Sequence, residues 1–429
     1  MKYLMSAILL SLPVIANAQV TPLPADRVVD SIGVNVHPEF FASLPSVYSD
    51  PAYANIIQSE LIASGVRYVR AGSAAPSGDN PQHKAEYFAR EMALNNAGIK
   101  LTIVAPALTR LANIDTDFNS SGGWYQAEGT NEPDLSGQSC SKIIANQTTL
   151  YNAIKNDQLV SSLSVLGPSL TITNSVNWLK TCPTFTGIAD VGNWHTYIHA
   201  VNPEAAGWDH TYYAHAQSLY PNMSIYATEY GYRSVQAGEI AGQNHVAGAP
   251  DAIIARYMPR WILTKIQIGY DRSFWHQIAD NHVPSPTDPN SGYGLIDYYG
   301  NIKPQWTAIK SLIAMFADPT PITPVPFNYT VTPISGNMTA PTTMFFQRSD
   351  GKYMLPIWLG LPGWDGNTYM VTPVAPEVVS IQLQLDSTYA RPVEIDTFND
   401  DGTVSVNTVV PVGGLFYMTV TDQLQVLIF

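Results

Sequence analysis

The chain has 429 residues and a mass of 46.8 kDa, which fits two domains or one large barrel with an appendage. Hydrophobic residues make up 45 % of the sequence and charged residues only 13 %, which excludes disorder as the main state. The formal net charge is −13, and no run of Lys or Arg occurs, so we expect no nucleic-acid partner. A surface poor in charge suits neutral polar ligands.

The first 18 residues have the pattern of an export signal. Lys2 is followed by an apolar stretch, Leu4–Ile15, and by a small-x-small cleavage sequence that ends at Ala18. A membrane anchor is the alternative, but the stretch is too short to span a bilayer comfortably. We therefore expect residues 1–18 to be a signal peptide, with no membrane anchor. The mature chain would begin at Gln19 and be secreted or periplasmic.

Two cysteines, Cys140 and Cys182, are present in the whole chain. Export would place them in an oxidising compartment, which favours a structural disulfide between them. Two buried free thiols are the alternative. Because no cluster of Cys and His has the spacing of a metal site, we expect no metal to be bound there.

From Ser31 to Phe316, short apolar runs alternate with stretches of helical periodicity. The predicted strands are Ser31–His37, Val66–Gly72, Lys100–Pro106, Trp124–Asn131, Ser164–Ser169, Asp190–Tyr197, Ser224–Tyr230 and Arg272–His276. The predicted helices are Pro51–Ser64, Gln82–Ala97, Ser141–Gln158, Asp251–Ile268 and Pro304–Phe316, with Ser141 and Asp251 as N-caps. Strands that alternate with helices indicate a parallel sheet, and eight such units over about 290 residues predict a (β/α)8 TIM barrel. A doubly wound open sheet is the rival, but no glycine-rich phosphate loop follows the first strand.

The pattern changes at Asp318, where four prolines within eight residues form a stiff linker. Beyond it come only short β-type runs separated by Gly, Pro, Asn and Asp, which predict a small antiparallel β-sandwich. We therefore divide the chain into a signal peptide at 1–18, a barrel at 19–317 and a C-terminal β-sandwich at 318–429.

Two glutamates stand at the ends of predicted strands. The fourth strand ends in Asn131-Glu132-Pro133, and Glu229 is next to last in the seventh. Because a (β/α)8 barrel carries its site at the carboxyl ends of the strands, both carboxylates would face the barrel mouth. Glycoside cleavage needs such a pair: one acid that protonates the leaving oxygen, and one carboxylate that attacks or stabilises the anomeric carbon. Burial and mutual repulsion can separate their pKa values in this way.

Other strand ends add polar and aromatic groups. Arg70 is suited to keep a nearby carboxylate ionised, and the alternative is that it neutralises Glu128. His195 and Tyr197 are two residues apart on the sixth strand, so their side chains point to the same side. Trp275 could form the floor under a sugar ring, and His37 ends the first strand. Ordinary packing is the alternative for His195, Trp275 and His37.

Three aromatic residues follow the sixth strand on a predicted loop that would lie at the barrel mouth: Trp208, Tyr212 and Tyr213. They could form a sugar platform. A small core within the loop is an equally good interpretation.

Together, these motifs resemble those of glycoside hydrolase clan A. Asn131-Glu132-Pro133 is similar to its acid/base signature, and the sequence from Ala227 to Tyr232 is similar to its nucleophile signature. Further likenesses are found at Arg67–Arg70, His195–Tyr197, Phe274–Trp275 and Tyr293–Asp297, in the expected order. The resemblance covers about Gly33 to Phe316 and is nearest in pattern to families 39 and 5. Gly129-Thr130 departs from family 39, whose members often carry a bulky or aromatic pair there.

The resemblance implies a retaining mechanism, with Glu132 as acid/base and Glu229 as nucleophile. It also implies that Asn131 bonds the sugar 2-hydroxyl, that Tyr197 and Arg70 hold Glu229, and that His195 contacts the sugar or supports the acid/base.

We therefore expect a secreted, retaining glycoside hydrolase that cleaves β-glycosidic bonds in a polysaccharide or oligosaccharide by double displacement. This reaction needs no metal and no organic cofactor. Few basic residues accompany the predicted site, which favours a neutral glycan. The alternatives are a transglycosylase that remodels an exported polysaccharide, and a non-catalytic carbohydrate-binding barrel. The sequence makes no prediction of the oligomeric state.

Overall fold

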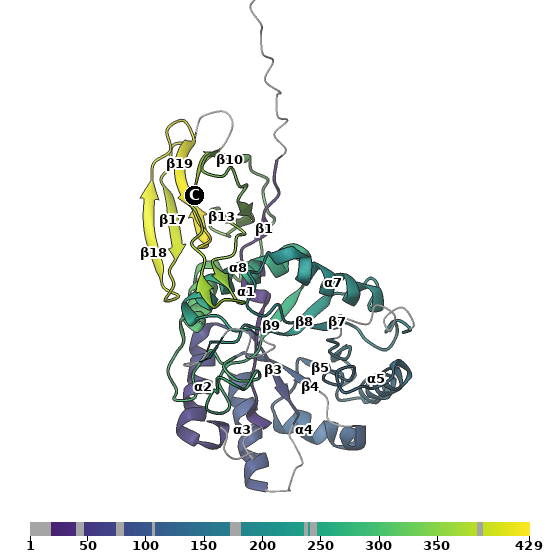
Figure 1. Cartoon of the computed structure of the whole chain (residues 1–429). Coiled ribbons are helices and arrows are strands. Elements are labelled where there is room, and N and C mark those ends of the chain that lie inside the picture. The colour runs from purple at the N-terminus through teal and green to yellow at the C-terminus, as the bar shows by residue number, and fades with distance from the viewer. Residues whose placement is uncertain are drawn as a thin grey trace, which may run out of the picture.

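The protein consists of a barrel and a sandwich that pack against each other (Figure 1). This computed structural model describes residues 19–39, 47–73, 81–104, 108–171, 182–235, 239–240, 247–383 and 389–429. The expected signal peptide, 1–18, lies outside the described residues.

The barrel is a sheet of eight parallel strands in the order β6-β5-β4-β3-β2-β9-β8-β7. Its strands are β2 (Ile32–Asn35), β3 (Tyr68–Gly72), β4 (Lys100–Val104), β5 (Gln126–Glu128), β6 (Ser164–Leu166), β7 (Gly192–Thr196), β8 (Ile225–Tyr230) and β9 (Arg272–Trp275). A parallel bridge between Leu166 and Val191 joins the two ends of this order, so the sheet closes. Each observed strand falls within a predicted one, and the predicted (β/α)8 barrel is confirmed.

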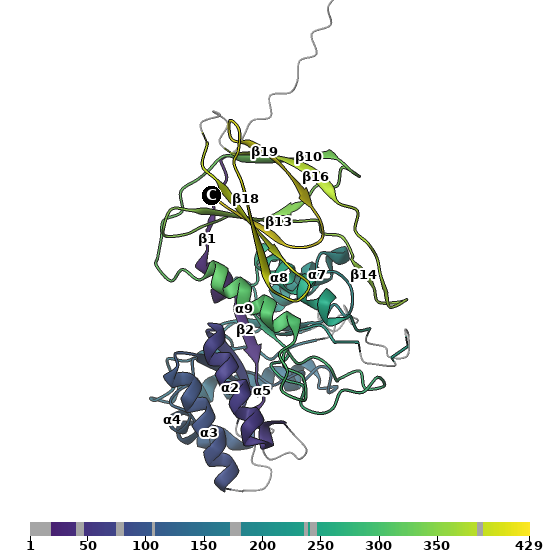
Figure 2. The same ribbon diagram turned by 90° about the vertical axis from the view of Figure 1, so that its left-hand side faces the viewer.

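Helices cover the outside of the barrel (Figures 1 and 2). They are α1 (Asp26–Asp30), α2 (Pro51–Ser64), α3 (Pro81–Asn96), α4 (Ile114–Ser120), α5 (Cys140–Lys155), α7 (Trp208–Leu219), α8 (Asp251–Ile268) and α9 (Pro304–Phe316). Both predicted N-caps are wrong. Ser139, not Ser141, caps α5 by accepting a hydrogen bond from the Lys142 amide, and Pro250 precedes α8, in which Asp251 is the first residue.

Two antiparallel sheets form the C-terminal sandwich, and a separate hairpin projects from it. The larger sheet contains β11 (Thr342–Thr343), β12 (Phe346–Gln347), β13 (Tyr353–Trp358), β17 (Val393–Phe398), β18 (Val404–Val409) and β20 (Gln425–Ile428). The smaller one contains β10 (Tyr329–Ser335), β16 (Glu377–Leu383) and β19 (Leu415–Val420). Leu355, Ile381 and Phe416 contribute to the apolar core of this domain. The hairpin consists of β14 (Trp364–Asp365) and β15 (Met370–Val371).

The structure corrects the predicted start of the barrel at residue 19. The first described residues belong to the sandwich, because strand β1 (Leu23–Pro24) pairs in parallel with β12 at the edge of the larger sheet. The amides of Leu23 and Ala25 donate to backbone carbonyls of that edge at 2.9 and 2.8 Å. An edge strand exposes unpaired backbone groups, and β1 satisfies some of those of β12.

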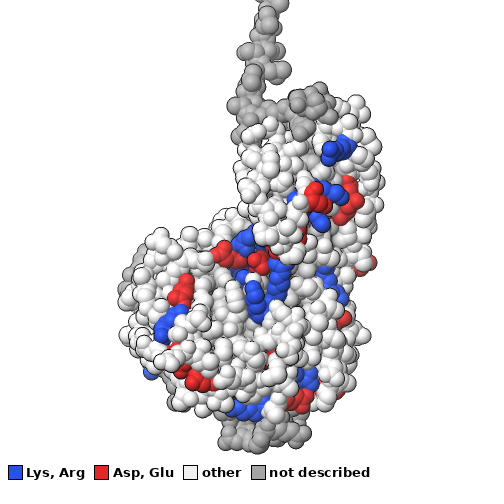
Figure 3. Space-filling model, turned by 180° about the vertical axis from the view of Figure 1, so that it is seen from behind, with Lys and Arg blue, Asp and Glu red and all other residues white. Residues whose placement is uncertain are grey.

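Ion pairs fix the sandwich to helix α8. Arg256 binds Asp400 and Asp422 at 2.7 and 2.9 Å, and Arg260 binds Glu204 of the barrel and the Asp422 carbonyl. Figure 3 shows charged side chains of both signs near this junction, on a face that is otherwise largely uncharged.

Cys140 and Cys182, for which a disulfide is predicted, are joined in the structure, with their Cα atoms 5.6 Å apart. The bond ties the first residue of α5 to a segment 42 residues later in the chain. None of the described helices combines the length and the hydropathy needed to cross a membrane.

Candidate active site

A cavity of about 660 Å³ opens at the carboxyl ends of the barrel strands. Its size lies in the range of about 300–1,000 Å³ that is usual for small-molecule sites. Six of the eight predicted catalytic and substrate-binding residues line it: His37, Asn131, Glu132, His195, Tyr197 and Glu229.

Glu229, near the end of β8, is held by hydrogen bonds at both carboxylate oxygens. Arg70 donates to Oε1 at 2.7 Å, and the Tyr197 hydroxyl donates to Oε2 at 2.7 Å. Burial alone would raise the pKa of Glu229, but the charges of His195, His276 and Arg70 and the Tyr197 hydrogen bond hold it well below its usual range. Burial lowers the pKa of His276 itself to about 4. At neutral pH His276 is therefore uncharged and does not contribute to this lowering of the Glu229 pKa. Arg70 and Tyr197 still contribute, and they keep Glu229 ionised.

Arg70 organises the floor of the site. Its guanidinium binds both oxygens of Glu128 at 2.7 and 2.8 Å, and it also donates to Asn35, Asn131 and Glu229. Arg70 therefore has both of the roles predicted for it: it neutralises Glu128 and it holds Glu229. However, Arg70 is only 3 % exposed and does not line the cavity. It is therefore a positioning residue and not one of the substrate-binding residues among which the sequence placed it.

Glu132 has a more open environment than Glu229. Its side chain is 23 % exposed, against 11 % for Glu229, and its Oε1 lies 2.8 Å from Nδ1 of His195. The backbone of Glu132 has a φ of 42°, which lies in the left-handed region. Residues other than glycine rarely adopt this conformation, and it costs on the order of 1–3 kcal/mol. Its amide is fixed by a 3.0 Å hydrogen bond to the Ser169 carbonyl. The fold thus holds this strained residue in place at the cavity wall.

The two carboxylates are close together. One ligand atom from each of Glu132, His195 and Glu229 lies within 4.8 Å of the other two. Carboxyl groups about 5–5.5 Å apart are typical of retaining glycosidases, whereas inverting enzymes leave about 6.5–9.5 Å between them for a water molecule. Oxygens of Glu132 and Glu229 that lie within 4.8 Å of each other are compatible with the shorter of these two spacings.

The same three residues are also a possible ligand set for a metal ion. His and carboxylate side chains are suitable ligands for zinc. Here, however, Nδ1 of His195 already lies 2.8 Å from Glu132, and both oxygens of Glu229 accept hydrogen bonds. The atoms that would bind a metal are therefore already engaged in contacts with one another and with neighbouring side chains.

Asn131 and His37 take up defined positions around the pair. The Asn131 Oδ1 accepts from Arg70 at 2.7 Å, which orients the amide nitrogen as the group available to donate. His37 lies 2.9 Å from Glu39, and its ring is 5.6 Å from that of His276.

The prediction that Trp275 forms the floor under a sugar ring is wrong. Its indole is 1 % exposed and packs edge-on against Tyr230 and Trp261, on the side of the strand that faces α8. The next residue, His276, lines the cavity instead. Successive side chains of a strand point to opposite sides, so only one of the two could face inward.

Sequence reasoning missed three ring-bearing residues that line the cavity: His199, His276 and Tyr293. Tyr212 lies on α7, which was predicted as a loop, and its hydroxyl donates to the Tyr197 carbonyl at 3.2 Å. Tyr213 packs against Tyr270, away from the cavity. Alternation along the strand says only that Trp275 and His276 face opposite sides, so His276 was the alternative to Trp275 as the inward-facing residue.

Gly129 explains the departure from the family 39 pattern. A Cβ atom at this position would lie 2.3 Å from the side chain of Gln147 and 2.7 Å from the backbone of Pro168. The barrel wall beneath Glu132 therefore has no room for a bulky residue at position 129.

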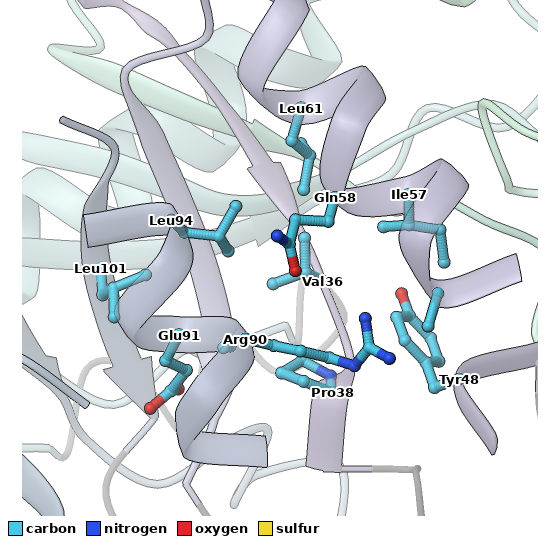
Figure 4. Close-up of a pocket in the computed structure, with 12 residues that line it drawn as sticks. Val36, Pro38, Tyr48, Ile57, Gln58, Leu61, Arg90, Glu91, Leu94 and Leu101 are labelled. Carbon is cyan, nitrogen blue, oxygen red and sulfur yellow. The ribbon is translucent and has the colours of Figure 1, made fainter. Parts of the chain in front are cut away.

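A much smaller cavity, of about 30 Å³, lies between α2, α3 and the barrel strands (Figure 4). Apolar side chains, including Val36, Ile57 and Leu94, make up most of its wall. It has room for about one or two water molecules, so it is too small for a substrate.

No model of a known protein family matches the sequence, and no curated protein sequence matches it. Solved structures do match. A family 39 glycoside hydrolase from the gut symbiont Bacteroides cellulosilyticus WH2 is similar with a TM-score of 0.55 and 13 % identity, over 95 % of this chain and 82 % of that chain.

Two further structures are similar over smaller parts of their lengths. An exo-β-1,4-mannosidase from Opitutaceae bacterium strain TAV5 has a TM-score of 0.49 and 12 % identity, over 71 % of this chain and 62 % of that chain. A β-glucuronidase from Faecalibacterium prausnitzii has a TM-score of 0.48 and 15 % identity, over 66 % of this chain and 49 % of that chain. The likeness to the family 39 structure shows that the two chains share a fold over nearly all of this chain.

Proposed function

We propose that this protein is a secreted, retaining glycoside hydrolase that cleaves β-glycosidic bonds of a neutral oligosaccharide or polysaccharide. The observation that carries the proposal is the pair Glu132 and Glu229, whose oxygens lie within 4.8 Å in unequal environments. The buried carboxylate is held ionised, and the more exposed one stands beside a histidine at the cavity wall. A nucleophile and an acid/base need this difference.

In the first step, a carboxylate oxygen of Glu229 attacks the anomeric carbon while the bond to the leaving group breaks. Glu132 gives its proton to the leaving oxygen, and a glycosyl ester on Glu229 results. In the second step, Glu132 takes a proton from a water molecule whose oxygen attacks the same carbon. Glu229 leaves as a carboxylate, Glu132 is protonated again, and two inversions give net retention.

The surrounding residues have separate roles in this mechanism. Asn131, oriented through its contact with Arg70, donates its amide N–H to the sugar 2-hydroxyl. Arg70 and Tyr197 keep Glu229 ionised and aimed at the cavity, and His195 holds the side chain of Glu132 in place.

The charge of the cavity supports a neutral substrate. Among the described residues that line it, none is Lys or Arg. A uronic acid brings a carboxylate that would need a cationic partner, because an unpaired charge in a partly buried site is costly. A neutral sugar has no such requirement.

Export is also part of the proposal. Residues 1–18 have the pattern of a signal peptide, and the Cys140–Cys182 disulfide suits an oxidising compartment. N-terminal sequencing of protein recovered from a secreting host should begin at Gln19. A mature chain that still begins at Met1 would contradict export by this signal.

The activity is tested with a panel of neutral and uronic polysaccharides and aryl β-glycosides. ¹H NMR should show the β-anomer as the first product, and Glu229→Gln should bind substrate without turning it over. An α-anomer as first product would contradict retention. Mainly transferred products would identify a transglycosylase, and binding without turnover in the wild type would identify a carbohydrate-binding barrel.

A further inference from the structure

A second cavity, of about 590 Å³, lies where the barrel meets the sandwich. One wall is the segment Ile198–Trp208, which follows β7, and the other is the β14–β15 hairpin of the sandwich. Figure 2 shows the segment with β14 extending from the sandwich toward α7. This cavity is similar in volume to the one at the glutamate pair.

The two cavities adjoin each other. His199 lines both of them. The aromatic side chains are also continuous, since the ring of Trp208 in the second cavity lies 6.3 Å from that of Tyr212 in the first. Tyr212 in turn donates to the carbonyl of Tyr197, whose hydroxyl binds Glu229.

The walls of the second cavity have the chemistry of a saccharide site. Trp208 is 46 % exposed, so part of its indole is accessible to a ligand, and sugar C–H faces pack well on such rings. Asp365 and Asn367 add a carboxylate and an amide group that can bond hydroxyls. None of the described lining residues is Lys or Arg, as in the first cavity.

This second cavity is also rigidly built. The Trp364 indole donates to the Gly248 carbonyl at 3.1 Å, and the Gly363 amide donates to the Tyr257 hydroxyl at 2.7 Å. A Cβ atom on Gly366 would lie 2.6 Å from the Cβ of Ala200, so the hairpin lies directly against the barrel segment. A site that is formed before binding loses little free energy to ordering its walls.

We propose that this second cavity is a binding subsite for further sugar residues of the same neutral saccharide chain that enters the catalytic cavity, with one ring stacked on Trp208. The sandwich then takes a direct part in substrate recognition through its β14–β15 hairpin. This inference rests on the proposed function, and it specifies an oligosaccharide or polysaccharide, rather than a small glycoside, as the substrate.

Chain-length dependence tests the subsite. The variants are Trp208→Ala on the barrel side and Asn367→Ala on the exposed turn of the hairpin. Tyr417→Ala is the matched control, because Tyr417 is an exposed aromatic residue on β19 that lines neither cavity. Values of kcat/KM are measured for an aryl β-monoglycoside and for neutral oligosaccharides of two to six residues with the same sugar.

We expect Trp208→Ala to lower kcat/KM about five- to tenfold for the longer oligosaccharides, mainly through KM, and to leave the monoglycoside unchanged. Asn367→Ala should give a smaller loss with the same dependence on length, and Tyr417→Ala should give none. An equal loss on all substrates, or no loss on any, would overturn the proposal.

A binding measurement separates this inference from the catalytic one. Calorimetric titration of a neutral hexasaccharide into Glu229→Gln, with and without Trp208→Ala, reports the subsite without turnover. Suppose that the wild type shows no cleavage of any substrate, while the hexasaccharide still binds and Trp208→Ala weakens that binding. The subsite then stands and the proposed hydrolase fails. If the wild type cleaves and Trp208→Ala does not weaken binding, the hydrolase stands and the subsite fails.

Discussion

The cavity at the glutamate pair and the barrel–sandwich junction are both built around a buried arginine. Arg70 binds Glu128 and Glu229 beneath the cavity, and Arg260 binds Glu204 and the Asp422 carbonyl at the junction. Both guanidinium groups are almost completely buried. In each region, the acidic partner compensates a cation that would otherwise be costly to bury.

The two regions differ in what the carboxylate faces. At the junction, Glu204 also accepts from the Trp358 indole and from the Asn202 amide, so its oxygens are taken up by structural contacts. At the site, Glu229 is held just as firmly but lines an open cavity. Two carboxylates in similar arginine ion pairs therefore differ in their other neighbours: Glu204 faces further protein groups, whereas Glu229 faces a cavity that a ligand could enter.

The largest expected effect is on kcat, and it distinguishes Glu229 at the cavity from Glu204 at the junction. Glu229→Gln should lower kcat at least about 10⁴-fold, because the amide cannot form the glycosyl ester, whereas Glu204→Gln should lower kcat less than about threefold. Steady-state kinetics on an aryl β-glycoside measures both. Substantial activity in Glu229→Gln would show that another residue is the nucleophile.

Glu132→Gln tests the other half of the pair. Loss of general acid/base catalysis should lower kcat about 10²–10⁴-fold, with the smallest loss for leaving groups that need no protonation. The measurement compares a dinitrophenyl glycoside with an alkyl glycoside. Equal losses on both substrates would argue against proton donation by Glu132.

The arginines themselves provide the most direct comparison. Arg70→Met and Arg260→Met each leave a carboxylate without its buried partner, so each should reduce the free energy of unfolding by about 3–5 kcal/mol. Only Arg70→Met should also lower kcat/KM by more than tenfold when assayed below its unfolding temperature. Urea unfolding and kinetics together test this, and similar activity losses in both variants would remove the distinction.

The smallest effect concerns pH. Since the folded pKa of Glu229 lies below its usual range, Glu229 stays ionised as the pH falls through 4.5, and the acid limb of kcat/KM should lie below pH 4. Tyr197→Phe removes one of the interactions that lower this pKa, so its acid limb should move to higher pH and its kcat should fall about tenfold. The pH profile, with circular dichroism to confirm folding, checks this. An unshifted limb would mean that another group controls it.

The barrel could be predicted because each of its strands is a short apolar run and most of the covering helices show clear periodicity. The fold also explains why strand-end residues such as Glu132 and Glu229 meet, since parallel strands present their carboxyl ends together. The orientation of Trp275 and His276 was beyond the sequence, because alternation says that they face opposite sides but not which side faces in.

Helix α7 and the β14–β15 hairpin could not be predicted, because neither has a clear hydrophobic pattern in the sequence. Helix α7 packs through Tyr212, Ala216 and Leu219, an apolar face that is too weak to distinguish from a loop. The second cavity depends on a hairpin whose strands have two residues each, so no strand pattern could reveal it.

The pairing of β1 with β12 has a consequence for biosynthesis. Val20 and Phe327, like Leu23 and Phe346, meet although they are more than 300 residues apart in the chain. The residues of β1 leave the ribosome early and their partners in β12 leave it late, so the whole barrel sequence is synthesised before β1 can pair with the sandwich. In a nascent or shortened chain that lacks β12, the strand Leu23–Pro24 has no partner. The pairing of β1 with β12 can form only after β12 has been synthesised.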